Sequence, residues 1–144
     1  MSQLERHPST GAAVSMRLGI GFVAGFFSVL IFQMAAIAIL QAAGVAFPFA
    51  AWSLEPVPPL AVPLSLSAAF WGGLWGVVYA LLEPRLTARL GWLAGGLVFG
   101  ALPVLVLWFV VLPLKGLPVG GGFTLAGVLV GIVVHAAFGL GTAI

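Results

Sequence analysis

Long apolar runs separated by short polar or proline-rich segments dominate the chain. A helix needs about 20 mostly apolar residues to cross the hydrocarbon core of a bilayer. The runs therefore predict an all-α fold, a polytopic membrane protein with four transmembrane helices. The predicted spans are residues 17–43, 63–82, 90–112 and 123–144. Residues 1–15 are polar and are expected to form an N-terminal tail, which leaves residues 16–144 as one four-helix domain.

The first apolar run follows Arg6 and Arg17, as a signal peptide would. However, the run from Leu18 to Leu40 is longer than the apolar core of about 7–15 residues that signal peptides carry. It also lacks a small-residue cleavage pattern at its end. We therefore expect it to be a retained first span.

Residues 44–62 form the longest connection, and prolines interleave with aromatic residues along it. Proline cannot continue a helix, and aromatic rings favour the membrane interface. Two arrangements are compatible with this composition. The loop either lies along the headgroup layer or tucks inward, where protein would have to cover its backbone.

The composition supports a membrane protein, because 62% of the residues are hydrophobic and 6% are charged. The mean hydropathy is +1.27, and a soluble domain carries roughly 25% charged residues. The net charge of +2 excludes a nucleic-acid-binding surface, which needs clustered Lys and Arg. The absence of cysteine excludes disulfides, thiol nucleophiles and cysteine-ligated clusters.

The few basic residues predict an orientation. Arg6, Arg17, Arg85 and Arg89 fall on one side of the predicted spans, and Lys115 falls on the other. Cytoplasmic loops carry the excess of Lys and Arg. We therefore expect a multi-pass protein of the bacterial inner membrane with its N-terminus and C-terminus in the cytoplasm.

Small-residue motifs recur in every predicted span, and such motifs let helix backbones approach closely in lipid. The candidate helix-packing residues are Gly21, Gly25, Gly72, Gly76, Gly91, Gly95, Gly96, Gly100, Gly127 and Gly131. Tight packing is one interpretation, and a narrow path or a groove for a lipid or pigment is the alternative.

Two polar side chains stand out within the spans. His135 continues the glycine stripe of the fourth span, so it should face protein. Buried polar residues in membranes are costly unless paired and often mark function. His135 either bonds a hydroxyl or a backbone carbonyl, or serves as a ligand or proton relay. Gln33 is expected to make an interhelical hydrogen bond or to line a transport path.

Trp71 and Trp75 are four residues apart and predict an aromatic row on the second span. The row is a packing or lipid-facing surface, or it stacks against a quinone or pigment. Haem bound by two histidines would need a second buried histidine, and the other histidine, His7, lies in the tail. The identity of any cofactor stays open.

An enzyme is not expected. General acid–base catalysis needs a positioned titratable group, and the spans contain no paired carboxylates, no Ser/His/Asp set and no histidines at metal-binding spacing. The Gly120–Gly122 triplet lacks the Lys-Ser/Thr of a phosphate-binding loop.

The stretches Phe70-Trp-Gly-Gly-Leu-Trp-Gly76 and His135-Ala-Ala-Phe-Gly-Leu-Gly141 resemble patterns in uncharacterised bacterial inner-membrane proteins of the YagU-like group. The resemblance implies an inner-membrane protein and carries no active site.

The pattern as a whole favours a non-catalytic accessory or structural subunit, packed in a membrane complex or homo-oligomer. Its partners would be the lipid bilayer and other membrane subunits or further copies of the chain. A small oligomeric transporter or channel, and a subunit binding a quinone, pigment or haem, are the alternatives.

Overall fold

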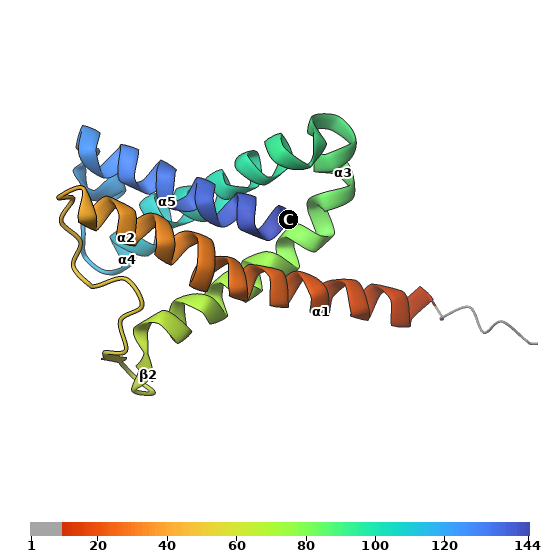
Figure 1. Ribbon diagram of the computed structural model, residues 1–144, viewed down its shortest axis with the longest axis horizontal. Helices are drawn as coiled ribbons and strands as arrows, with labels where there is room; N and C mark the ends of the chain where they lie inside the picture. The colour runs from red at the N-terminus through yellow and green to blue at the C-terminus, as the bar shows by residue number, and fades with distance from the viewer. Residues whose placement is uncertain (1–9) are drawn as a thin grey trace, which may run out of the picture.

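The computed structural model describes residues 10–144, and most of them are helical (Figure 1). Three helical segments are long and apolar enough to cross a membrane. They are Gly11–Ala42, Leu64–Leu114 and Leu125–Ala143. The prediction of long apolar helices that fit a membrane is therefore confirmed. However, these residues form three such helical segments and not four.

The first segment is a continuous rod made of α1 (Thr10–Ser28), the π-helical turn η1 (Val29–Gln33) and α2 (Met34–Ala42). It begins seven residues before the predicted start at position 17. Positions 10–15 of the predicted tail are therefore helical, because nothing between Thr10 and Arg17 breaks a helix. Positions 1–9 of that tail lie outside the described residues.

The 44–62 connection contains a two-stranded antiparallel hairpin. β1 (Pro56–Val57) pairs with β2 (Val62–Pro63), with Pro56 opposite Pro63. The Pro58–Pro59 peptide bond between the strands is cis. The loop thus has a defined structure and delivers the chain directly into the next helix.

Helix α3 (Leu64–Val106) runs through the second predicted span and through the third as far as Val106. The charged link at residues 83–89, where the sequence predicted a connection, is helical even though it contains Pro84. The interruption lies at Gly91, whose φ of 74° and ψ of 167° are non-helical. Figure 1 shows α3 turning back between its green and teal parts. We call Leu64–Leu90 the first arm of α3 and the part from Trp92 onward the second arm.

The second arm continues through Pro103 into the π-helical turn η2 (Leu107–Val111) and the short α4 (Leu112–Leu114). A 3₁₀ turn, η3 (Val119–Gly122), then leads to α5 (Leu125–Ala143). The Thr124 hydroxyl accepts a 3.2 Å hydrogen bond from the Gly127 N–H and caps α5. This cap satisfies one of the free N–H groups in the first turn.

Four rods pack around a small aromatic core. The rods are α1 with α2, the two arms of α3, and α5, with the most extensive contacts between α1 and α3 and between α3 and α5. Phe99, at 0% exposure, lies at the centre and contacts the rings of Tyr79, Trp75 and Phe138. This core joins both arms of α3 to α5.

The ends of the rods gather at two poles. The start of α1 and the turn within α3 lie toward the right of Figure 1, and the C-terminus lies nearer the middle on the same side. The end of α2 and the connection between α4 and α5 lie toward the left. We call these the Gly91 pole and the loop pole.

Candidate functional site

Four of the candidate packing glycines meet where α1 crosses the first arm of α3. A methyl group added at Gly25 would lie 2.8 Å from the Cα atom of Gly76, and one added at Gly21 would lie 2.7 Å from the Cβ atom of Ala80. A methyl group at Gly72 would lie 2.8 Å from the carbonyl oxygen of Gly25. The two backbones are therefore in direct contact, as small residues permit in membrane helices.

A second crossing joins the other arm of α3 to α5. A methyl group at Gly96 would lie 2.9 Å from the carbonyl oxygen of Gly139, and one at Gly100 would lie 3.1 Å from the carbonyl carbon of His135. Gly139 was not among the candidate glycines. The spacing of four residues that links Gly131 to His135 continues to Gly139 and could have identified it.

Gly95 and Gly131 do not lie at a close backbone crossing between two rods. The nearest atom to a methyl group at Gly95 is the Cβ of Leu86, at an ordinary 3.4 Å. A methyl group at Gly131 would lie 2.7 Å from the indole ring of Trp108. Gly131 thus leaves room for a tryptophan from the same helical hairpin and does not sit at a backbone crossing.

Gly91 and Gly127 have roles other than packing. Nothing lies within 4 Å of a methyl group at Gly91, and its positive φ places it at the turn between the arms of α3. A methyl group at Gly127 would lie 2.9 Å from the Thr124 hydroxyl, next to the α5 cap. Both were predicted to pack helices because each is followed by a second glycine four residues later. The glycines at the two backbone crossings have the same spacing.

His135 is half-buried, and its ring is bonded within its own helix. Its Nδ1 atom lies 2.8 Å from the carbonyl oxygen of Gly131, one turn earlier. The backbone of His135, not its ring, forms the contact with Gly100. The arrangement matches the interpretation of a histidine bonded to a backbone carbonyl.

Gln33 ends the π-helical turn η1 and is half-buried. Within residues 10–144, no hydrogen bond joins its side chain to His135 or to any other group. These two polar residues therefore do not form a common site inside one chain.

The π-helical turn also shows how the long loop is held. The indole N–H of Trp52 donates a 2.7 Å hydrogen bond to the carbonyl oxygen of Leu30, inside η1. In a π-helical turn the backbone hydrogen bonds span five residues and not four. A backbone carbonyl without a hydrogen-bond partner is costly in a membrane. Leu30 lies about 18 Å along the helix axis from the end of α2. The loop therefore folds back along the first rod.

Gln41 fastens the same loop at its start. Its amide nitrogen donates to the carbonyl of Phe49 at 2.8 Å, and its amide oxygen accepts from the N–H of Ala51 at 3.2 Å. At the other end of the loop, the Ser65 hydroxyl donates to the carbonyl of Ser53 at 2.8 Å. Sequence reasoning gave Gln41 no special role, because one glutamine near an interface has no distinctive pattern.

Hydroxyl groups also join α1 to α5. The Ser28 hydroxyl donates to the carbonyl of Phe138 at 2.6 Å, and the Thr142 hydroxyl donates to the same carbonyl at 2.8 Å. Both side chains are buried. Like the loop contacts, these bonds run from a polar side chain to a backbone group of the same chain.

Trp71 and Trp75 do not form one aromatic row. Trp71 is 60% exposed and packs beside Phe70, which is also exposed. Trp75 is half-buried and contacts the central Phe99 with a ring-centroid distance of 6.4 Å. One indole faces outward and the other joins the core, so they do not present a common stacking surface.

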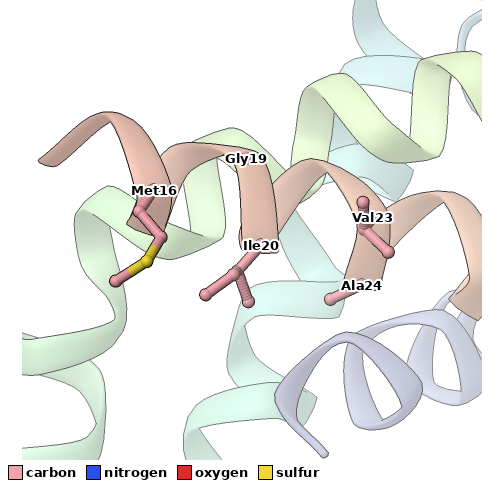
Figure 2. Close-up of a pocket in the computed structure, with 5 residues that line it drawn as sticks. All are labelled: Met16, Gly19, Ile20, Val23 and Ala24. Carbon is pink, nitrogen blue, oxygen red and sulfur yellow. The ribbon is translucent and has the colours of Figure 1, made fainter. Parts of the chain in front are cut away.

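A crevice opens at the Gly91 pole between α1, α3 and α5. Arg17 and Glu83 form an ion pair of 3.4 Å at its edge, and Tyr79 and Thr142 also line it. An apolar groove lies beside it along the outer face of α1. Figure 2 shows the groove, lined by Met16, Gly19, Ile20, Val23 and Ala24.

Among residues 10–144, no three His, Cys, Asp or Glu side chains come together as they would around a metal ion. Comparison with known proteins found no matching family model, no matching curated protein and no matching solved structure. The resemblance to the YagU-like group therefore stays a prediction, and the function must be argued from the contacts above.

Proposed function

We propose that the chain is a four-span protein of the bacterial inner membrane with both termini in the cytoplasm. The two arms of α3 support four crossings, because at 1.5 Å per residue they measure about 40 Å and about 34 Å. Each exceeds the hydrocarbon thickness of about 30 Å. The Gly91 turn would then lie at a membrane surface.

The distribution of charge supports this orientation. Arg85 and Arg89 lie within six residues of Gly91 on α3, and Arg17 pairs with Glu83 of the same arm. Lys115 lies at the loop pole. The excess of arginine at the Gly91 pole fits the cytoplasmic side of a membrane.

Cysteine labelling tests this arrangement, because the natural chain has no cysteine. In intact spheroplasts, a membrane-impermeant maleimide should label Lys115→Cys at once and Arg89→Cys only after permeabilisation. Both positions are exposed in the folded chain. Labelling of both from the same side would rule out a crossing by the second arm of α3, and the reversed pattern would overturn the orientation.

We further propose that the protein is a non-catalytic structural subunit that assembles with further copies of itself or with other membrane subunits. The observation that supports this role is the use of polar side chains. Ser28, Gln41, Ser65, Thr142 and His135 all bond backbone groups of their own chain. Ser28 joins α1 to α5, Gln41 and Ser65 hold the loop, and Thr142 and His135 bond within α5.

Gln33 favours assembly in particular. An amide in a membrane span seeks a hydrogen-bond partner, and Gln, Asn and Ser side chains provide such bonds between helices. The half-buried Gln33 has no partner within residues 10–144. A neighbouring subunit would supply one.

Co-purification of two differently tagged copies, together with particle mass in nanodiscs, tests the proposal. Wild-type protein should be recovered as a homo-oligomer or with other membrane proteins, and Gln33→Leu should weaken that association. Strictly monomeric wild-type particles would contradict it. If instead Gln33→Leu left the assembly intact and abolished a solute flux, the small oligomeric transporter would be the better interpretation of the same amide.

A further inference from the structure

We propose that the crevice at the Gly91 pole and the adjoining groove on α1 together bind one anionic phospholipid. Arg17 would hold the phosphate of the headgroup, and an acyl chain would lie along the groove beside Gly19. The site would add a specific lipid to the protein's interactions, whether or not the chain assembles into oligomers.

The two hollows adjoin each other. Ile20 and Ala24 line both the polar crevice and the apolar groove. The crevice has a volume of about 160 Å³ and contains the Arg17 and Glu83 side chains. From Arg17 to Ala24 the helix rises about 10 Å. A charged edge that continues into an apolar channel matches the division of a phospholipid into headgroup and chain.

Arg17 has donors left for a phosphate. Its contact with Glu83 is a single one, from one terminal nitrogen at 3.4 Å, and its side chain is 46% exposed. A guanidinium carries five N–H donors in a fixed fork that suits phosphate oxygens. Tyr79 also lines this crevice, whereas the Thr142 hydroxyl in its lining already donates to the carbonyl of Phe138. The arrangement resembles the basic pockets between transmembrane helices that hold anionic headgroups.

The groove exists because Gly19 has no side chain. Met16 and Ile20, which are 65% and 62% exposed, flank Gly19 along α1, and Val23 and Ala24 follow one turn further on (Figure 2). Nothing lies within 4 Å of a methyl group placed at Gly19. A larger residue there would fill the groove without disturbing a helix contact.

Native mass spectrometry of the full chain in mild detergent, titrated with phosphatidylglycerol or phosphatidylcholine, tests the site. Wild-type protein should retain the anionic lipid preferentially, as an adduct of one lipid per chain. Arg17→Gln should weaken phosphatidylglycerol binding about fivefold, the factor expected for one basic residue near an anionic lipid. Gly19→Leu should weaken binding of both lipids because it removes the space for the chain.

Matched controls separate this site from general charge and bulk. Arg89→Gln removes a charge at the same pole, and Gly11→Leu adds the same bulk at another position on α1 with nothing within 4 Å. Both should retain lipid as the wild type does. Glu83→Gln should strengthen phosphatidylglycerol binding, because it frees Arg17 from its carboxylate.

Three results would overturn the proposal. Equal losses from Arg17→Gln and Arg89→Gln would mean diffuse attraction to charge. Displacement of the lipid by inorganic phosphate, with no effect of Gly19→Leu, would indicate a free-anion site. Loss of self-association in Gly19→Leu with unchanged lipid adducts would assign the groove to a second copy of the chain.

Discussion

A methyl group at Gly25 cannot be placed without separating α1 from the first arm of α3. Its nearest neighbour there is the carbonyl oxygen of Gly72, and the next are backbone atoms of Gly76, with the Cα at 2.8 Å and the nitrogen at 2.9 Å. Carbon atoms pack at about 3.5–4.0 Å, so Gly25→Ala requires the two helices to move apart by roughly 0.7 Å or more. Overpacking of this kind costs about 1–3 kcal/mol.

Two further glycines give a graded series with the same chemical change. At Gly73 the obstacle is the ring of Phe22, with its Cε2 atom at 2.6 Å, and a side chain can rotate away more easily than a backbone can shift. At Gly19 nothing lies within 4 Å. We therefore expect the loss of stability to increase from Gly19→Ala, near zero, through Gly73→Ala to Gly25→Ala.

Reversible unfolding in mixed detergent micelles, followed by tryptophan fluorescence, measures the series. Because the three variants share the same change in composition, differences among them report the crossing and not the loss of glycine. If Gly25→Ala does not fold, Gly73→Ala and Gly19→Ala still test the order. Equal stabilities for Gly25→Ala and Gly19→Ala would refute the close backbone crossing.

Four other substitutions test the remaining contacts. Trp52→Phe removes the hydrogen bond to Leu30 and should lower the free energy of unfolding by about 0.5–1.5 kcal/mol. It should also speed amide hydrogen exchange in residues 44–62. Unchanged exchange would contradict the loop attachment. Ser28→Ala and Thr142→Ala should each cost little, because the other hydroxyl still serves the shared carbonyl. In the same unfolding assay, the double variant should lose more stability than the two single variants together. Additive losses would argue against a shared acceptor. Gly91→Ala places a non-glycine residue in an unfavourable backbone conformation, which costs about 1–3 kcal/mol. Its methyl group meets no other atom. A stability equal to that of the wild type would show that the turn lies elsewhere.

The periodic and compositional features of the sequence were enough to predict apolar membrane helices, because long runs without charge have few other stable arrangements. The number of continuous helices was harder to predict. Pro84 and the charged residues around it suggested a connection, yet the helix continues through them and turns at Gly91. A proline removes one hydrogen bond, whereas the conformation at Gly91 is one that L-residues rarely adopt.

The polar contacts were less predictable than the glycine crossings. Spacing alone brought Gly21 and Gly25 to attention, since residues four apart share a helix face. By contrast, the bond from Trp52 to Leu30 depends on a π-helical turn and on a loop that folds back, and neither has a clear local pattern. Serine and threonine are similarly ambiguous, because their hydroxyls can bond many backbone groups.

The irregular turn in the first rod and the long loop are best understood together. A transmembrane helix must satisfy its own backbone groups, and any departure from the regular ladder has to be compensated by protein. Trp52 bonds the carbonyl of Leu30 inside η1. Gln33, the last residue of η1 and the one directly before the core residue Met34, keeps an amide available on the same helical segment. The loop therefore completes the backbone of the first rod from within the chain. The Gln33 amide is the group at this turn that the chain does not satisfy, and for this reason the assembly experiment is directed at it.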